Sequence, residues 1–413
     1  MYKNKTIWIF NHYASSFYNE KGGRHFSIAK YLKKYGYTPV IFCSNKIHNT
    51  LGFCFENYNL TNERIEEDTG VKYVFVRGRN YKKNGLKRLL NIFDYYFNLF
   101  KIIKQYEEGP DLIYASSVHP LTLVAGIKIA KRLNIKCVCE VRDLWPESLI
   151  AYDVLDKNSL FVFILRGLEK WIYIHADSLI FTMEGAYRYI IEQGWEYDIP
   201  SEKVHYINNG VDIEQFDKNK TLFGFYDKDL NDPNTFKVIY TGSIRKANRL
   251  EDLVNAAAKI KEENIRILIW GNGDELEALK TICFRKSINN IVFKGAVEKK
   301  KIPYIISNAD ILFLDPFDKD VAKYGISSNK LFEYFASGKP ILTNVDSEYN
   351  PAQKKGCNLL YTSDADGISN AIISAYKLSK AEYTKLCEHS ADAAKDYSFE
   401  NLTMELIKVF ENT

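Results

Sequence analysis

Short runs of apolar residues alternate with longer stretches of helical periodicity from one end of the chain to the other. Runs such as residues 6–10 and 236–241 have the length and the β-branched and aromatic content of buried strands. Between them, apolar residues recur at helical spacing. Strands and helices that alternate in this way are typical of parallel sheets covered by helices on both faces. The pattern therefore predicts an α/β fold.

The predicted strands fall into two series. In the first half they are residues 6–10, 38–43, 73–76, 111–116, 136–141, 178–182 and 204–208. In the second half they are residues 236–241, 265–270, 291–294, 311–314 and 340–343. Each series is typical of a Rossmann-like unit.

A polar segment separates the two series. Residues 217–234 have no clear period, which places a domain boundary near residues 209–235. We therefore predict an N-terminal domain over residues 1–208 and a second domain over residues 209–395. Within the last segment, 396–413, a helix is expected over residues 399–410, and its pattern would allow it to pack on either domain.

Length and composition narrow the class of protein. The 413 residues exceed the usual size of one hydrophobic core, and 46% hydrophobic with 26% charged residues is typical of a soluble globular protein. No apolar run has the length of a membrane span, and the first residues lack a secretory signal pattern, so we expect a cytoplasmic protein. The seven scattered cysteines indicate reduced thiols rather than a disulfide framework or a metal site. The net charge of +4 is too small to indicate nucleic acid binding.

Residues 325–341 are the most informative stretch, because a small polar loop leads into a short helix and then into an apolar strand. Unpaired backbone amides at a helix start attract phosphate. The residues that would offer them are Ser327, Ser328 and Asn329. Lys330 adds a mobile positive charge, and Glu333 is placed to accept hydrogen bonds from ribose hydroxyls. Phosphate with ribose indicates a nucleotide, although an ordinary cap before a core helix has the same pattern.

Two further loops of the second half combine glycine with charge. The first contains Gly242, Ser243, Arg245, Lys246 and Arg249. Its three cations suit a diphosphate, although surface loops are commonly charged. The second loop follows the next strand and contains Gly271, Gly273 and Glu275. Glycine there would allow a close approach to a base or ribose, and a tight turn would require the same residues.

Candidate residues of the first half lie near strand ends. Gly22 and Gly23 follow the first strand, where glycine would let the backbone approach a phosphate or sugar, and a flexible connection fits equally well. His119 could hydrogen-bond an acceptor hydroxyl or a phosphate. Asp143 or Glu147 could act as the base for that hydroxyl, or serve as a helix cap and a first-turn charge.

Residues 77–104 carry many cations and one acid, Asp94. The cations include Lys82, Lys83, Lys87 and Arg88, and the apolar residues at helical spacing are Leu86, Leu90, Phe93, Phe97 and Phe100. A basic helix with aromatic residues suits an anionic membrane surface. A surface helix whose apolar stripe packs on its own sheet has the same pattern.

Taken together, these residues resemble the family 4 glycosyltransferases of the GT-B fold, over almost the whole chain. The similarity is strongest in SSVHPLT (116–122) with EVRDLWPES (140–148), in YTGSIRKANRLEDL (240–253) and in SSNKLFEYFASGKPI (327–341). These segments resemble the branch that contains fucosamine-type amino-sugar transferases of O-antigen and capsule assembly. The resemblance implies two facing Rossmann-like domains, with the acceptor bound by the first and the nucleotide sugar mainly by the second. It also implies a final helix that crosses back to the N-terminal domain.

The implied activity is hexosyl transfer with retention at the anomeric carbon, without a metal ion or a cofactor. The branch favours an amino sugar on UDP as donor, with a base pocket near residues 271–275 and Val297. The implied acceptor is a hydroxyl of a lipid-diphosphate-linked saccharide, which a cytoplasmic enzyme would reach by binding peripherally to the inner membrane through residues 77–104. Catalytic roles would fall to His119, Asp143, Lys330 and Glu333.

The chain departs from the family pattern at three points. Glu333 matches the second of the family's paired glutamates, but the first falls on Gly325. At the positions where an Arg and a Lys usually hold the diphosphate, the chain has Ser243 and Arg249, so Arg245 or Lys246 would substitute. Many members carry a His where this chain has Arg142 or Asp143.

Two other interpretations stay open. A sugar-nucleotide epimerase shares the two-domain architecture and would act on the donor alone. A non-catalytic subunit that binds nucleotide, or that scaffolds a membrane assembly, would fit Gly325 and the basic helix. A dehydrogenase is disfavoured, because neither Rossmann-like unit carries the dinucleotide fingerprint after its first strand.

Overall fold

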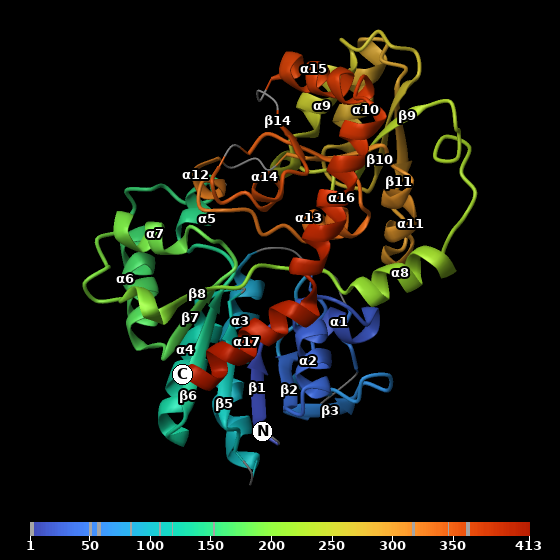
Figure 1. Ribbon diagram of the computed structural model, residues 1–413. Coiled ribbons are helices and arrows are strands. Elements are labelled where there is room, and N and C mark those ends of the chain that lie inside the picture. The colour runs from blue at the N-terminus through green and yellow to red at the C-terminus, as the bar shows by residue number, and fades with distance from the viewer. Residues whose placement is uncertain are drawn as a thin grey trace. The chain divides into compact units, whose positions relative to one another are not determined.

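The chain divides into two compact units (Figure 1). Unit 1 comprises residues 1–208 and 399–413, and unit 2 comprises residues 209–398. The computed structural model describes residues 4–48, 52–55, 59–82, 85–106, 109–117, 119–151, 153–315, 319–345, 347–360 and 364–413. Lys83, one of the cations of the predicted basic helix, lies outside these described residues.

An eight-stranded sheet forms the centre of unit 1. Its strands are β1 (Thr6–Phe10), β2 (Thr38–Ser44), β3 (Thr61–Ile65), β4 (Lys72–Val76), β5 (Leu112–Ser116), β6 (Lys136–Val141), β7 (Ser178–Phe181) and β8 (Val204–Tyr206). Their order is β3-β4-β2-β1-β5-β6-β7-β8, and only the β3–β4 pair is antiparallel. The sequence pattern missed β3, because this edge strand has a single apolar residue, Ile65.

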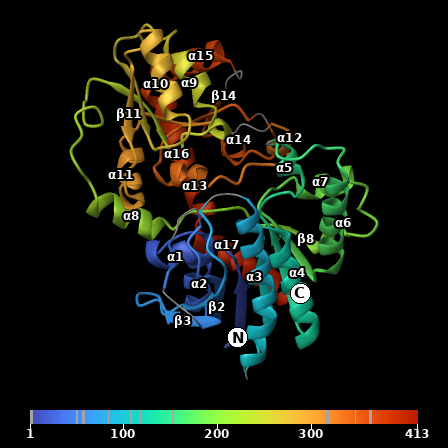
Figure 2. The same cartoon turned by 180° about the vertical axis from the view of Figure 1, so that it is seen from behind.

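Helices cover both faces of this sheet. They are α1 (Ser15–Glu20), α2 (Arg24–Lys34), α3 (Leu86–Ile102), α4 (Pro120–Leu133), α5 (Glu147–Ala151), α6 (Leu160–His175), α7 (Ala186–Glu192) and α17 (Phe399–Asn412), with short 3-10 turns at Ile103–Gln105 and Ser201–Lys203. The last helix, α17, contacts α2 and lies in front of the sheet in Figure 1, whereas α3 lies in front of it in Figure 2. The final helix therefore returns to unit 1, where the family resemblance placed it.

Unit 2 is built on a parallel six-stranded sheet. Its strands are β9 (Phe236–Thr241), β10 (Ile265–Trp270), β11 (Ile291–Gly295), β12 (Ile311–Leu314), β13 (Ile341–Thr343) and β14 (Asn358–Leu360), in the order β11-β10-β9-β12-β13-β14. Its helices are α8 (Ile213–Leu222), α9 (Leu250–Ala257), α10 (Leu276–Arg285), α11 (Ile302–Ser307), α12 (Lys319–Ala322), α13 (Asn329–Ala336), α14 (Pro351–Lys355), α15 (Ala365–Tyr376) and α16 (Lys380–Asp396), with 3-10 turns at Lys246–Asn248 and Lys299–Lys301.

Helix α8 extends into the segment that the sequence pattern left without a period. It begins after Asp212, whose carboxylate accepts the N–H of Gln215 as an N-cap. Phe216 is the buried residue of this helix, so its apolar face is too narrow to produce a recognisable period. Polar composition alone was therefore a poor guide to an irregular linker here.

The strand order reverses once in each sheet. In unit 1 the reversal lies between β1 and β5, and in unit 2 it lies between β9 and β12. Ligands of open parallel sheets bind outside the carboxyl ends of the strands at this switch point. The fold therefore directs attention to the residues after these four strands. Within the described residues, no helix is both long and apolar enough to cross a membrane.

Candidate active site

Helix α13 is held at the switch point of unit 2 by its buried face. The hydroxyl of Tyr334 accepts the N–H of Thr241 at 3.3 Å and lies 3.4 Å from the carbonyl oxygen of Phe313, to which it donates. The apolar residues beside it are fully buried: Leu331, Phe332 and Phe335. Because Thr241 ends β9 and Phe313 belongs to β12, the start of α13 is fixed where the strand order reverses.

At the start of α13, the amide of Leu331 donates to the carbonyl of Ser328 at 3.1 Å. Ser328 precedes the helix in an extended conformation, and no side chain caps this end among the described residues. The side-chain nitrogen of Asn209 donates to the backbone carbonyl of Ser327 at 2.9 Å, which ties the loop to the beginning of unit 2. A helix start without a side-chain cap is suited to an anion, and the anion site at residues 327–329 stays a prediction.

Lys330 lies in the first turn of α13 and is partly buried. Its ammonium group donates to the hydroxyl of Tyr240 at 3.0 Å and to the side-chain oxygen of Asn248 at 2.8 Å. Tyr240 in turn donates to the carbonyl of Ser243 at 2.7 Å. Burial lowers the pKa of Lys330 to about 8, and the nearby carboxylate of Glu333 opposes this shift. The positive charge therefore stands in a fixed polar cluster rather than at the end of a mobile surface side chain.

Gly242 makes room for Lys330. The residue has a φ of +142°, which side chains rarely adopt, and a Cβ atom there would overlap the Cε of Lys330. A side chain at position 242 would therefore displace Lys330 from Tyr240.

Gly271 and Gly273 have a different close neighbour. A Cβ at Gly271 would overlap the carbonyl of Gly242, and one at Gly273 would overlap the carbonyl of Ile244. The two loops are joined by backbone hydrogen bonds, from Gly242 to Trp270 at 2.9 Å and from Ile244 to Asn272 at 3.0 Å. The packing of one loop on the other is sufficient to require these glycines, whatever ligand lies beyond them.

The three cations of the first loop differ from Lys330. Arg249 forms an ion pair with Asp252, with nitrogen–oxygen distances of 2.8 and 2.7 Å. Arg245 and Lys246 are exposed. Arg249 is thus held by a partly buried ion pair, as Lys330 is held by its hydrogen bonds, whereas the side chains of Arg245 and Lys246 lie at the surface.

The remaining predicted donor residues line the same edge of unit 2. Glu333 is partly exposed, and its carboxylate forms no hydrogen bond within the described part of the chain. Burial raises the pKa of Glu333, whereas Lys299 and Lys330 lower it. Glu275 precedes α10 and Val297 follows β11, and both are partly exposed. Of the described residues, neither of these two is joined to Lys330 by a hydrogen bond or an ion pair.

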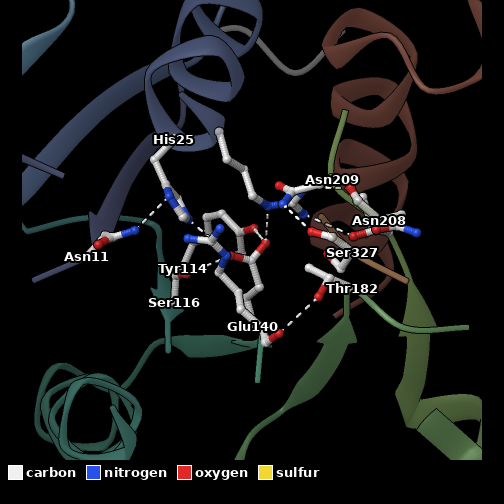
Figure 3. A network of polar contacts seen from close by, with 12 residues as sticks. Asn11, His25, Tyr114, Ser116, Glu140, Thr182, Asn208, Asn209 and Ser327 are labelled. Atoms are coloured by element: carbon white, nitrogen blue, oxygen red, sulfur yellow. Dashed lines mark hydrogen bonds and ion pairs between the residues drawn. The ribbon is translucent and has the colours of Figure 1, made fainter. Parts of the chain in front are cut away.

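Glu140 is the centre of a buried polar network in unit 1 (Figure 3). Its carboxylate accepts from Arg24 at 2.6 Å, from His25 at 3.0 Å and from Ser116 at 2.6 Å, and also from Tyr114. Burial would raise the pKa of Glu140, but Arg24 and His25 hold it well below its usual range. Since Arg24 also donates to the backbone carbonyls of Ile207 and Asn208, the network fixes the end of the first segment of unit 1.

Gly22 and Gly23 lie immediately before α2, and the short helix α1 separates them from β1. Gly23 has a φ of +92°, and a Cβ there would overlap the ring of Phe17. A Cβ at Gly22 would make an ordinary contact with the Glu20 carbonyl at 3.7 Å. Local packing therefore requires glycine at position 23 but not at position 22.

His119 is paired with a second histidine that the sequence analysis did not single out. The Nε2 of His119 lies 2.6 Å from the Nδ1 of His12, and both side chains are buried. His12 follows β1 and His119 follows β5, so the pair stands at the switch point of unit 1. The available signal for His12 was its place directly after the first strand, because a lone histidine without a spacing motif indicates no particular chemistry.

Asp143 and Glu147 have separate surroundings. Asp143 is exposed, and within the described residues no hydrogen bond joins it to His119. Glu147 accepts from Arg166 of α6 at 2.6 and 3.1 Å, which favours the structural interpretation of this carboxylate. Across the described ranges, no group of three or more His, Cys, Asp and Glu side chains is arranged to hold a metal ion.

Two family models match the chain. One, described as Glycosyltransferase Family 4, covers residues 26–215, and the other, described as Glycosyl transferases group 1, covers residues 235–377. These matches confirm the family that the sequence motifs resemble.

Curated relatives are distant. The probable glycosyltransferase WbjE of Pseudomonas aeruginosa is 22% identical over 65% of this chain and 66% of its own length. The putative teichuronic acid biosynthesis glycosyltransferase TuaH of Bacillus subtilis is 23% identical over 45% of this chain and 44% of its own. The chain thus spans about two thirds of the length of the first relative and less than half of the second.

Solved structures match over the whole length. Sucrose-phosphate synthase of Thermosynechococcus elongatus superposes with a TM-score of 0.72 at 16% identity, covering 99% of this chain and 98% of that one. HepE of Anabaena, in complex with UDP-glucose, gives a TM-score of 0.67 at 15% identity, covering 99% of this chain and all of that one. At such identities the likeness concerns the fold, and it confirms the predicted GT-B architecture.

Proposed function

We propose that this chain, which belongs to the family 4 glycosyltransferases of the GT-B fold, transfers a sugar from a nucleoside diphosphate to a hydroxyl during surface polysaccharide biosynthesis. The observation that carries the proposal is the position of Lys330 and Glu333 on α13, at the switch point of unit 2. A nucleotide diphosphate needs a cation, free amides and a carboxylate for its ribose, and this short segment supplies all three.

The donor chemistry follows from these groups. The bond between the anomeric carbon and the diphosphate oxygen breaks, and the amides of α13 together with Lys330 stabilise the charge that develops on the leaving phosphate. A new bond forms from the acceptor oxygen to the anomeric carbon on the same face, and the hydroxyl proton passes to the leaving phosphate. Retention of configuration and independence of a metal ion are part of the proposal, supported by the family resemblance.

The donor is proposed to be a UDP-linked N-acetylated amino hexose. Uridine is supported by the HepE structures, which were solved with UDP and with UDP-glucose. The amino sugar is supported by the resemblance of residues 140–148 and 327–341 to the fucosamine-type branch. The edge of unit 2 from Gly271 to Val297 would hold the base.

The acceptor is proposed to bind to unit 1. His119 would accept a hydrogen bond from a substrate hydroxyl, and the exposed carboxylate of Asp143 would contact the acceptor. Their place at the carboxyl ends of β5 and β6 supports these roles. A lipid-diphosphate-linked saccharide is the proposed acceptor class, in the assembly of an O-antigen or a capsule.

The surface of α3 supports a lipid-linked acceptor. Four of its apolar residues are exposed, with fractions of 71%, 47%, 39% and 57%: Leu86, Leu89, Phe93 and Phe97. Other residues face the interior, namely Asn91, Tyr95, Leu99 and Ile102. Two other residues of the predicted apolar stripe, Leu90 and Phe100, are partly buried. The four exposed residues support a membrane contact. Exposed lysines at both ends of the helix suit anionic headgroups.

Vesicle binding tests this surface. We expect Phe93→Ser with Phe97→Ser to reduce sedimentation with vesicles of anionic phospholipid at least severalfold, because each ring contributes buried apolar area to the interface. Phe284→Ser removes a ring that is 87% exposed on α10 of unit 2 and serves as the matched control. Equal sedimentation of all three proteins would contradict the membrane role of α3.

Calorimetric titration with UDP, GDP and ADP tests the donor site. We expect saturable binding of UDP that is weakened at least tenfold by Lys330→Met, since a charge-assisted hydrogen bond is worth about 1.5–3 kcal/mol. Lys385→Met, which removes an exposed cation of α16, should bind UDP as the unaltered protein does.

The other outcomes of this titration separate the alternatives. Binding of GDP or ADP in place of UDP would change the donor class and keep the transferase. Failure to bind any nucleotide would overturn the donor site and favour a non-catalytic subunit. A UDP-sugar converted to its epimer without an acceptor would instead favour the epimerase.

A further inference from the structure

We propose that Asn91 and His12 are positioning residues that hold His119 in a single tautomer, with its Nδ1 lone pair free to accept a hydrogen bond from a substrate hydroxyl. The identity of that ligand rests on the proposed transferase function, whereas the tautomer follows from the geometry of unit 1. Neither positioning residue belongs to a motif of the sequence.

The contacts of Asn91 fix the orientation of its side-chain amide. Its side-chain nitrogen lies 2.7 Å from the backbone carbonyl of Arg79, and only the NH₂ group of the amide can donate to that oxygen. The side-chain oxygen of Asn91 therefore faces the Nε2 of His12, at 2.8 Å. Since an amide oxygen only accepts, His12 carries its proton on Nε2.

The proton position of His12 determines that of His119. Burial lowers the pKa of His12 to about 3, and burial together with His12 and Arg88 places the pKa of His119 well below its usual range. Both rings are therefore neutral at pH 7 and carry one proton each. Because the proton of His12 is on Nε2, its Nδ1 accepts, and the Nε2 of His119 must be the donor across the 2.6 Å contact.

The other ring nitrogen of His119, Nδ1, lies on the opposite side of the ring. With its proton on Nε2, the ring has a lone pair on Nδ1. This atom is buried and has no hydrogen-bond partner among the described residues, while the whole side chain is only 3% exposed. A buried acceptor without a partner is unfavourable, so its retention at a switch point indicates a ligand that donates to it.

The surroundings of His12 leave it little freedom. Its ring stacks on Tyr95, with centroids 4.5 Å apart and planes 14° from parallel, and the ring of Tyr13 lies 4.6 Å away. The hydroxyl of Tyr95 donates to the carbonyl of Phe42 at 2.7 Å, which fixes the stacked ring. Of the charged groups, Arg88 donates to the hydroxyl of Tyr13 at 2.9 Å and disfavours a second proton on either histidine.

The consequence for the reaction is a defined hydrogen-bond polarity. A lone pair on Nδ1 attracts the hydrogen of a hydroxyl and orients its oxygen, whereas a proton on Nδ1 would turn the ring into a donor. Asn91 and His12 do not touch the substrate in this account, and they act by setting the proton position of His119.

Nitrogen NMR of the ¹⁵N-histidine-labelled full chain tests the tautomer without any substrate. We expect His119 to be protonated at Nε2 and bare at Nδ1 from pH 6 to 8. A proton on Nδ1 in the unaltered protein would overturn the proposal. This arm is independent of the transferase function, so a protein with the expected tautomer but without sugar transfer would contradict only the proposed function.

Asn91→Asp tests the positioning role. The new carboxylate still accepts from Nε2 of His12, but its negative charge favours a second proton on His12. The Nδ1 of His12 then donates to Nε2 of His119, so the proton of His119 must move to its own Nδ1. We expect that change of tautomer on lowering the pH, with kcat/KM for transfer falling at least tenfold over the same range. Asn98→Asp adds the same charge to α3 at a residue that donates to the Arg77 carbonyl, and should leave the tautomer and the pH profile unchanged. An Asn91→Asp protein with an unaltered His119 tautomer would overturn the relay.

Discussion

Gly242→Ala separates the role of Lys330 from the rest of the donor site without altering any charge. The added methyl group would overlap the Cε of Lys330, and the backbone at this position has a φ of +142°. The lysine must therefore leave its hydrogen bonds with Tyr240 and Asn248. The protein keeps its net charge, so a loss of affinity would report the position of the ammonium group rather than its presence.

The expected magnitude follows from the contact that is lost. A charge-assisted hydrogen bond contributes about 1.5–3 kcal/mol, which corresponds to a dissociation constant for UDP about 10 to 150 times larger. The alanine also strains the backbone, at a cost of about 1–3 kcal/mol in the free energy of unfolding. Folding stability and nucleotide affinity must therefore be measured separately.

Calorimetric titration with UDP, together with urea unfolding, provides both quantities. Gly338→Ala is the matched control, because Gly338 also has a positive φ, +66°, and follows α13 without a close neighbour at its Cβ position. We expect both variants to lose stability and only Gly242→Ala to lose affinity. A folded Gly242→Ala protein that binds UDP as tightly as the control would refute the assignment of Lys330 to the diphosphate.

Three further predictions concern titration and burial. Nucleotide affinity should fall as the pH rises through about 8, because the pKa of Lys330 is about 8 and the anion binds the protonated lysine. Titrations from pH 6.5 to 9.5 should show this fall in affinity, and Lys330→Arg should remove it. Burial raises the pKa of Glu169 to about 8. The free energy of unfolding should therefore decline as the pH rises from about 4.5 to 8, by at most about 5 kcal/mol, and Glu169→Gln should flatten this decline. Glu140→Gln leaves the buried charge of Arg24 without its carboxylate and should lower the free energy of unfolding by about 3–5 kcal/mol in urea, whereas a loss below about 1 kcal/mol would contradict the ion pair.

The alternation of strands and helices was predictable because the buried strands are short, apolar and regularly spaced. The elements that were missed lack this signal. Strand β3 is largely exposed, β14 has only three residues, and α8 buries one large side chain. Pairing with a neighbouring strand stabilises β3 and β14, and packing on α11 stabilises α8, although the sequence pattern of each element is weak.

In the candidate site, some residues are adjacent in sequence and others meet only in the folded structure. Residues 327–333 could be proposed as a site from the sequence because the loop, cation and carboxylate are adjacent in the chain. The contact of Gly271 with the carbonyl of Gly242 and the pair formed by His12 and His119 join residues that are far apart in the chain. Periodicity indicated that α3 has an apolar stripe, but the direction of that stripe depended on Asn91, which faces inward to meet His12.

The central claim is that unit 2 holds the diphosphate of a nucleotide at the start of α13. A crystal structure of the protein with UDP tests it most directly. We expect phosphate oxygens within hydrogen-bond distance of the Lys330 ammonium group and of the first amides of α13, with the ribose hydroxyls hydrogen-bonded to Glu333. Phosphates bound instead at Gly22 and Gly23 of unit 1, or a ribose turned away from Glu333, would contradict it.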